Sequence, residues 1–147
     1  MVQLVLPNDA NTMGNVLGGR VLHWIDLAAA IVAHRHCRSE AVTASMDQVS
    51  FMAPIRIGQL AVIGARMTWT GTTSMEIRVD VQSEDLLSGQ RRQTSTAYLT
   101  FVAVDGNGRP KPVPPLLLET QEEEREARAA RERQEQRLKA RATVSGT

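Results

Sequence analysis

One aspartate lies in a run of residues that otherwise favours burial. Asp26 is the only carboxylate in LHWIDLAAA, residues 22–30. A carboxylate in such surroundings is costly unless something binds it or it performs chemistry. Apolar surroundings also make a carboxylate a stronger base than it is in water. The run therefore predicts that Asp26 acts as a base. The alternative, which stays open here, is a structural carboxylate that bonds local backbone or pairs with His23.

Two glycines, Gly18 and Gly19, precede Asp26 by about two helical turns. No Ser, Thr, Asp or Asn comes immediately before them, so a helix beginning there lacks the usual side-chain cap on its first amides. Glycine lets a ligand approach the backbone, and the positive end of a helix dipole favours an oxygen that gains negative charge. An uncapped helix end can therefore serve as an oxyanion hole. Together with a nearby base, it predicts hydrolysis of an acyl group.

The elements that must position these residues follow from the apolar pattern. Residues 18–37 are apolar too continuously for an alternating strand, and their alanines favour a mostly buried helix. Segments 41–51, 60–69, 75–82 and 96–104 read as strands separated by Gly, Pro, Asn, Asp and Ser turns. With a short strand at the N-terminus, this order predicts an α+β fold in which an antiparallel sheet wraps one helix.

Two of the predicted strands have clear faces. In MEIRVDVQ, residues 75–82, the apolar residues at odd positions should face the core, and Glu76, Arg78, Asp80 and Gln82 should face the other way. In residues 41–51 we expect Val42, Ala44 and Met46 on one face. The phase then shifts to Val49 and Phe51, as a β-bulge requires.

The C-terminal segment is dominated by charge. Glu119 to Arg141 contains seven acidic and seven basic residues, with Leu138 as the only large aliphatic side chain. Thr120 and Glu123 have the spacing of a capping box, so we expect a helix there. Because this helix has no apolar stripe to bury, it should be solvated and contribute little to stability. In the alternative interpretation, some of its arginines meet an anionic ligand or a neighbouring subunit.

Composition limits the class of protein. The 147 residues, 42% of them apolar, suit a single domain, which we place at residues 1–118, followed by the charged segment 119–147. The net charge of +1 and the aromatic content of 3% give no basis for nucleic-acid binding. No apolar run is long enough for a membrane span, and the N-terminal residues have no signal-peptide pattern. With one cysteine and no metal-like histidine spacing, we expect a cytoplasmic protein without a metal site.

The motifs in their order resemble a known family. PNDANTMGNVLGG, HWIDLAAAIVAHRHC, VTASMDQVSFMAPIRIGQ, GTTSMEIRVDVQSED and TFVAVDGNGRP together are similar to the acyl-CoA thioesterases of the hotdog fold, in the branch of cytosolic acyl-CoA and acetyl-CoA hydrolases. The resemblance implies a sheet curled around a central helix. It also implies a homodimer as the minimal active unit, often assembled to a hexamer as a trimer of dimers, and a role in lipid metabolism.

The resemblance also implies roles for individual residues. Asp26 would act on the water that attacks the thioester, and Asn11 of the partner protomer would help to position that water. The backbone amides of Gly18 and Gly19 would polarise the carbonyl. Acyl-CoA would be the substrate, with no metal or bound cofactor required; the alternative is a hotdog module that binds or senses acyl-CoA without hydrolysing it. The residues expected to contact coenzyme A are Ala44, Ser45, Met46, Thr73, Ser74 and Met75, together with Arg131 or Arg133 in the C-terminal helix.

Overall fold

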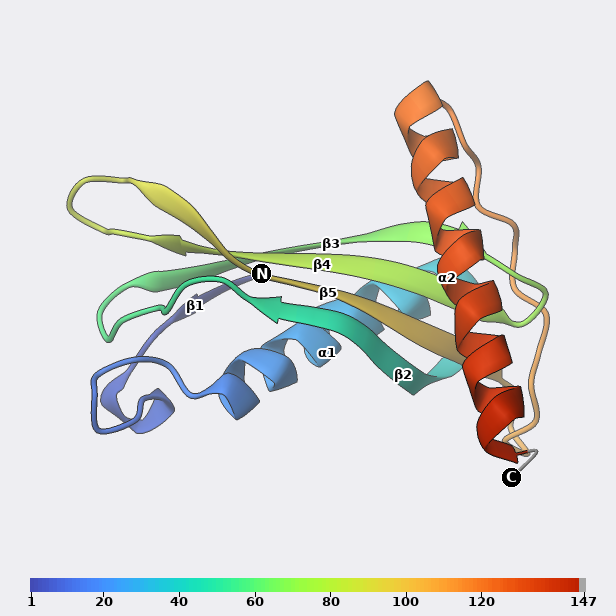
Figure 1. Cartoon of the computed structure of the whole chain (residues 1–147), viewed down its shortest axis with the longest axis horizontal. Helices are drawn as coiled ribbons and strands as arrows, with labels where there is room; N and C mark the ends of the chain where they lie inside the picture. The colour runs from blue at the N-terminus through green and yellow to red at the C-terminus, as the bar shows by residue number, and fades with distance from the viewer. Residues whose placement is uncertain (146–147) are drawn as a thin grey trace.

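The protein consists of a five-stranded antiparallel sheet with a long helix along one face and a second helix across one end of the sheet (Figure 1). The computed structural model describes residues 1–145. The strands are hydrogen-bonded in the order β1-β3-β4-β5-β2. This confirms the predicted α+β architecture. The elements in chain order are β1 (Val2–Leu4), a 3-10 turn η1 (Pro7–Asp9), α1 (Gly18–Cys37), β2 (Glu40–Phe51), β3 (Leu60–Thr70), β4 (Ser74–Glu84), β5 (Arg91–Val104) and α2 (Gln121–Ser145).

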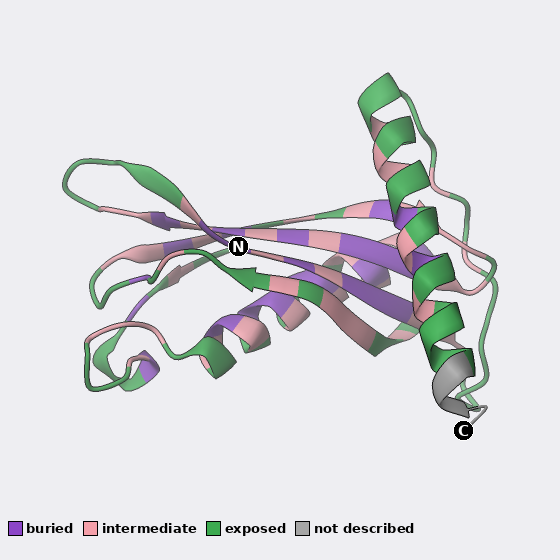
Figure 2. Ribbon diagram, viewed as in Figure 1, coloured by how far each residue is buried: buried purple, intermediate pink, exposed green. Residues whose placement is uncertain are grey.

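Helix α1 has the predicted bounds. It begins after Leu17, whose backbone is extended, and it ends where Arg38 adopts a left-handed conformation and donates its amide to the His34 carbonyl at 2.8 Å. Its buried residues recur every three or four positions, so one stripe of the helix packs against the inner face of the sheet (Figure 2). That stripe consists of Val21, Trp24, Ile25, Ala28, Ala29, Ala33 and Cys37.

The predicted faces of β4 are also confirmed. Met75, Ile77, Val79 and Val81 are fully buried in the core that the sheet forms with α1. The alternate residues point to the outer face of the sheet. One of them, Glu76, is nevertheless only 1% exposed, because α2 covers this end of the outer face.

Strand β2 departs from its predicted phase. Thr43 pairs with Phe101 and Ser45 pairs with Thr100, so Ala44 is the extra residue of a bulge. Phe101 belongs to the core, which places its partner Thr43 on the inner face. The prediction that Val42, Ala44 and Met46 share one face is therefore wrong, because a bulge inverts the alternation at its own position. The predicted later shift is confirmed between Asp47 and Ser50.

Helix α2 begins near its expected start but is not solvated all round. The Thr120 hydroxyl accepts a hydrogen bond from the Glu123 amide at 3.1 Å, as predicted for the cap. The Glu123 carboxylate accepts from the amide of Glu119, whereas a full capping box would use the amide of Thr120. On its sheet-facing side, Ala130 is 0% exposed and Gln134 is 5% exposed. The prediction of a solvated helix is wrong because hydrogen-bonded polar side chains, rather than an apolar stripe, form the buried face. Gly146 and Thr147, at the end of the predicted segment 119–147, lie outside the described residues.

None of the helices in residues 1–145 is both long and apolar enough to cross a membrane.

Candidate active site

The carboxylate of Asp26 lies between α1 and β2. Its side chain is half-buried, and its Oδ1 accepts a hydrogen bond from the Thr43 hydroxyl at 2.8 Å. Within residues 1–145 this is the one hydrogen bond of the Asp26 side chain. The alternative, a pair between Asp26 and His23, is therefore wrong. The bulge at Ala44 makes the contact possible, because it places Thr43 on the inner face beside α1. Thr43 was not among the predicted site residues, since simple alternation assigned it to the outer face.

At the start of α1, the backbone amides of Gly18 and Gly19 donate to no acceptor in residues 1–145. The first amides of the helix with backbone acceptors belong to Arg20 and Val21, and both donate to the Leu17 carbonyl, at 3.0 and 3.1 Å. Leu17 itself offers no side-chain cap, as predicted. A Cβ atom added to Gly18 or Gly19 would meet nothing within 4 Å, so packing within this chain does not require glycine at either position. The glycines instead leave the helix end open to a molecule outside the chain.

One helix cannot bring these amides and Asp26 to the same atom. Asp26 follows Gly18 by eight residues, and a rise of 1.5 Å per residue separates them by about 12 Å along the axis of α1. A hydrogen bond spans only about 3 Å. An amide of Gly18 and the carboxylate of Asp26 in one chain therefore cannot both contact one thioester group.

Asn11 lies in the exposed turn that follows η1. Its Oδ1 accepts hydrogen bonds from the amides of Met13 and Asn15, at 2.9 and 3.2 Å. The side-chain oxygen is thus used to shape the turn, whereas the side-chain NH2 group donates to no described residue. Met13 beside it is 80% exposed, a large apolar side chain that this chain does not cover. The turn therefore presents an amide donor and an apolar side chain to whatever lies outside the chain.

The two segments predicted to contact coenzyme A lie at the same end of the sheet. Thr43, next to Ala44, and Met75 both pair with Phe101, so β5 separates segments 44–46 and 73–75 by roughly 10 Å. Ser45 donates to Asp47 at 3.0 Å. Met75 is 0% exposed, so only its backbone is available to a ligand. The remaining predicted residues of these segments, Ala44, Met46, Thr73 and Ser74, are exposed or half-buried.

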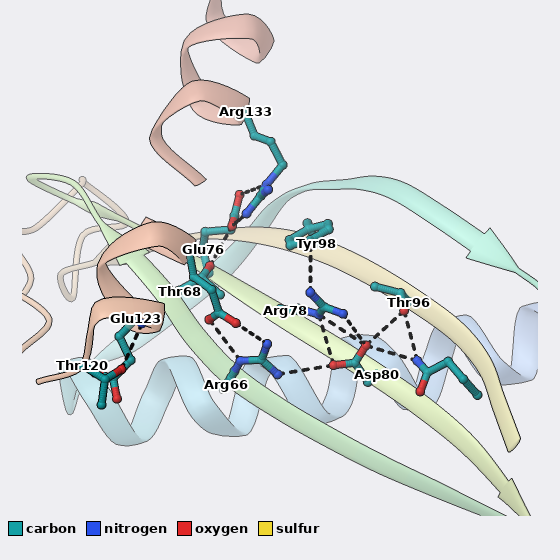
Figure 3. Close-up of polar contacts among 12 residues, drawn as sticks. Arg66, Thr68, Glu76, Arg78, Asp80, Thr96, Tyr98, Thr120, Glu123 and Arg133 are labelled. Carbon is teal, nitrogen blue, oxygen red and sulfur yellow. Dashed lines mark hydrogen bonds and ion pairs between the residues drawn. The ribbon is translucent and has the colours of Figure 1, made fainter. Parts of the chain in front are cut away.

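The structure separates the two predicted arginines. The side chain of Arg131 is 74% exposed and lies 3.6 Å from Glu135 within the same helix. Arg133 points to the sheet instead, where it donates two hydrogen bonds to Glu76, at 2.7 and 3.1 Å (Figure 3). Its guanidinium also lies 3.8 Å from the centre of the Tyr98 ring. Arg133 therefore fastens α2 to the sheet, and Arg131 remains directed to solvent.

A second group of charges links α2 to β3 and β4. Arg66 bridges Glu126 of α2 and Asp80 of β4, and Arg78 also donates to Asp80 (Figure 3). The hydrogen bond between Glu126 and Arg66 raises the pKa of the guanidinium and lowers the pKa of the carboxyl. Burial alone would raise the pKa of Asp80, but hydrogen bonds from Arg78 and Thr96 outweigh it and lower that pKa.

His34 and His36 each contact a backbone carbonyl. His34 Nδ1 lies 2.7 Å from the Ala30 carbonyl, and His36 Nε2 lies 2.7 Å from the Pro114 carbonyl. Within the described part of the chain, no three His, Cys, Asp or Glu side chains lie close enough together to hold a metal ion.

Comparison with known proteins assigns the family. Residues 13–89 match the model of the thioesterase superfamily, and the chain belongs to this superfamily. The chain is 46% identical over 106 residues to an uncharacterized acyl-CoA thioester hydrolase, YkhA, of Bacillus subtilis, a match that covers 72% of this chain and 62% of that relative. The resemblance inferred from the sequence is thereby confirmed. The matched region spans less than two thirds of that relative.

Solved structures of acyl-CoA thioesterases superpose closely on the protein. An apo-hexameric acyl-CoA thioesterase has a TM-score of 0.92 at 44% identity, with 97% of this chain and 91% of that chain covered. The acyl-CoA hydrolase of Staphylococcus aureus, in complex with butyryl coenzyme A, coenzyme A and coenzyme A disulfide, has a TM-score of 0.91 at 34% identity, with 99% and 89% covered. The hotdog fold predicted for the chain is therefore confirmed.

Three residues replaced in variants of the Staphylococcus aureus enzyme have the same sequence spacing as Asn11, Asp26 and Thr43. Its solved structures include three alanine variants, which replace an asparagine, an aspartate and a threonine. Those residues are separated by 15 and 17 positions in that enzyme. The same intervals separate Asn11, Asp26 and Thr43 in this chain.

Proposed function

We propose that the protein is an acyl-CoA thioesterase, which hydrolyses the thioester of acyl-CoA to a free carboxylic acid and coenzyme A. The observation that carries this proposal is the Asp26 carboxylate, held by the Thr43 hydroxyl at 2.8 Å in a chain of the thioesterase superfamily. No metal ion or bound cofactor is part of the proposed reaction.

In the proposed reaction, Asp26 acts on the attacking water. Thr43 donates to Oδ1 of Asp26, and Oδ2 has no hydrogen bond to any residue of the described chain. Oδ2 is thus available to take a proton from water while the water oxygen attacks the carbonyl carbon. The tetrahedral intermediate then collapses, the carbon–sulfur bond breaks, and the leaving thiolate takes up the proton. The contact with Thr43 fixes the orientation of the carboxylate without occupying the oxygen that reacts.

We assign the remaining groups of the site to a second copy of the chain. The separation of about 12 Å along α1 prevents Gly18 from sharing a substrate atom with Asp26 of its own chain. Asn11 and the amides of Gly18 and Gly19 would therefore come from the partner and bind the water and the developing oxyanion. The minimal unit of this proposal is a homodimer, with a trimer of dimers as the assembled form, since a solved relative is hexameric.

Apolar residues on the surface support a partner chain. Leu27 and Ile31 on α1 are 43% and 46% exposed, and Val42 on the edge strand β2 is 52% exposed. The outer edge of β2 is unpaired as well, so a single chain leaves both these side chains and a strand edge uncovered. A second copy would bury these side chains and bring its own Asn11 to the site.

Coenzyme A would bind at the end of the sheet where residues 44–46 and 73–75 flank β5. Arg131 is the arginine that we assign to a phosphate of the nucleotide, since its guanidinium is exposed and arginine pairs well with phosphate. Arg133 already pairs with the buried carboxylate of Glu76, which would lose its charged partner if Arg133 turned to the ligand.

Thiol release from a panel of acyl-CoAs tests the proposed function. Asp26→Asn preserves the shape of the side chain but removes the base, so turnover should fall by about 10²- to 10⁴-fold. Asp105→Asn is a matched control, because Asp105 caps an exposed turn through its Oδ1, a contact that an asparagine oxygen can also make. Turnover of Asp26→Asn within about threefold of wild type would remove Asp26 from the mechanism. Binding of acyl-CoA without thiol release by the wild type would identify a non-catalytic acyl-CoA-binding module instead.

A further inference from the structure

A pocket of about 330 Å³ opens between the first turns of α1 and the adjacent ends of β2 and β5. Seven of its eight lining residues are apolar. The volume lies at the lower end of the range of roughly 300–1,000 Å³ that is typical of small-molecule sites. Val21, one of the lining residues, is three positions from Gly18, so the pocket adjoins the free amides at the start of α1.

The pocket has a buried floor and an exposed apolar rim. Val21 and Ile55 are 3% and 1% exposed and belong to the core. Phe51 and Met52 at the rim are 55% and 56% exposed. Large apolar side chains grouped around a concave opening are typical of a site that binds an apolar ligand.

Ser95 is the one polar residue of the lining. It lies on β5 between Phe51 of β2 and Val81 of β4, on the face that packs toward α1, and it is 2% exposed. Its hydroxyl makes no hydrogen bond to any residue in 1–145. No buried side-chain nitrogen or oxygen of the described residues is sealed away without a partner, so this hydroxyl reaches the open space of the pocket. A hydroxyl that faces the pocket without a partner in the described chain can donate its proton to a ligand oxygen, and it can therefore favour ligands that carry such an oxygen.

We infer that this pocket receives the acyl chain of the substrate, and that Ser95 hydrogen-bonds an oxygen atom carried by that chain. The inference rests on the proposed function, because the thioester carbonyl must lie near the amides of Gly18 and Gly19 for the chain to enter beside Val21. The favoured substrate class is short acyl groups with a hydroxyl or oxo group beyond the thioester carbonyl. The small volume limits the length of the chain, and Ser95 selects its chemistry.

Two variants test the inference with butyryl-CoA, its 3-hydroxy and 4-hydroxy derivatives, and acetyl-CoA. For the wild type, kcat/KM should be about 2- to 10-fold higher for at least one hydroxyacyl derivative than for butyryl-CoA, the effect of one neutral hydrogen bond. Ser95→Ala should bring this ratio to about one or below. Ser50→Ala is the matched control, because Ser50 precedes Phe51 on β2 but pairs with Thr96 on the outer face, and it should leave the ratio unchanged.

The second variant, Ala53→Phe, narrows the pocket from a half-buried position and so avoids the core. It should lower kcat/KM for butyryl-CoA at least about tenfold more than for acetyl-CoA, whose acyl group has a single methyl beyond the carbonyl. Equal losses for both substrates, or a hydroxyacyl preference that Ser95→Ala leaves intact, would overturn the inference while the proposed function stands. Failure of the wild type to release thiol from any acyl-CoA would refute both.

Discussion

The pair formed by Arg133 and Glu76 should hold α2 on the sheet, and Arg133→Met tests this. The Glu76 side chain is 2% exposed and accepts hydrogen bonds from Arg133, from Thr68 at 2.7 Å and from Gln134 at 3.3 Å. Removing Arg133 leaves a buried carboxylate with neutral donors only. Breaking a buried ion pair in this way costs about 3–5 kcal/mol. For a chain of this length each kcal/mol lowers the Tm by about 2–4 °C, so we expect a loss of roughly 6–20 °C.

Two other variants calibrate that value. Arg131→Met removes an exposed i,i+4 pair with Glu135 and should cost less than about 0.5 kcal/mol. The double variant with Glu76→Met and Arg133→Met removes both charges and should recover most of the loss, since an apolar pair of similar volume often replaces a buried ion pair at little cost.

Thermal unfolding followed by circular dichroism measures the three variants, and amide hydrogen exchange over residues 121–145 shows whether α2 detaches first. Detachment limits the loss, because water then solvates Glu76, and it would appear as faster exchange in α2 alone. A Tm for Arg133→Met that falls no further than that of Arg131→Met would refute the claim that this buried pair fastens the helix.

Three further changes address the site and the charges on α2. Thr43→Val should lower kcat by about 10- to 100-fold, the cost of losing a hydrogen bond to a charged group, whereas Thr43→Ser should stay within about threefold; equal rates would exclude a role for the hydroxyl. Mixing inactive Asn11→Ala with inactive Asp26→Asn should restore up to about a quarter of wild-type turnover, because half of the dimers then have one complete site; no recovery after proven subunit exchange would place each site within one chain. Since Arg66 lowers the pKa of Glu126 from its ordinary value of 4.5, their pair stabilises the protein above that pH and the stability is lost as pH falls through the lowered pKa. Melting temperatures between pH 3 and 6 should therefore depend less on pH in Glu126→Gln, and identical pH profiles would contradict the assignment.

The sequence predicted the helix that carries Asp26 with its correct limits, because the continuous apolar residues and the alanines from Gly18 to Cys37 favour the same element. The faces of β4 followed from strict alternation. Thr43 was missed for a physical reason: alternation assigns a face by counting residues, and the bulge at Ala44 changes the count. The spacing that Asn11, Asp26 and Thr43 share with the replaced residues of the Staphylococcus aureus enzyme would have indicated Thr43, but it becomes visible only when two sequences are compared.

The packing of α2 against the sheet could not be predicted from the sequence alone either. Capping residues and charge order correctly indicated a helix, but its contacts with the sheet come from polar residues far apart in the chain. Arg133 and Glu76 are separated by 57 positions, and Arg66 and Glu126 by 60. Hydrogen-bonded contacts of this kind leave no periodic apolar pattern, so a helix that docks through them looks like a solvated one.

The bulge in β2 gives this strand one position that pairs with no residue of β5. Ala44 is exposed, so many side chains would fit at this position without disturbing the core. Deleting Ala44 would remove the bulge but keep the pairs on either side, because Thr43 would still lie opposite Phe101 and Ser45 opposite Thr100. Thr43 would stay on the inner face beside Asp26, and the strand would lose only the local bend and twist that a bulge produces. Deleting a paired residue between Ser45 and Asp47 is a different matter, because the residues before it would then change faces if the rest of β2 kept its register. Over evolutionary time this strand can therefore accept changes at Ala44 more readily than the loss of a paired neighbour.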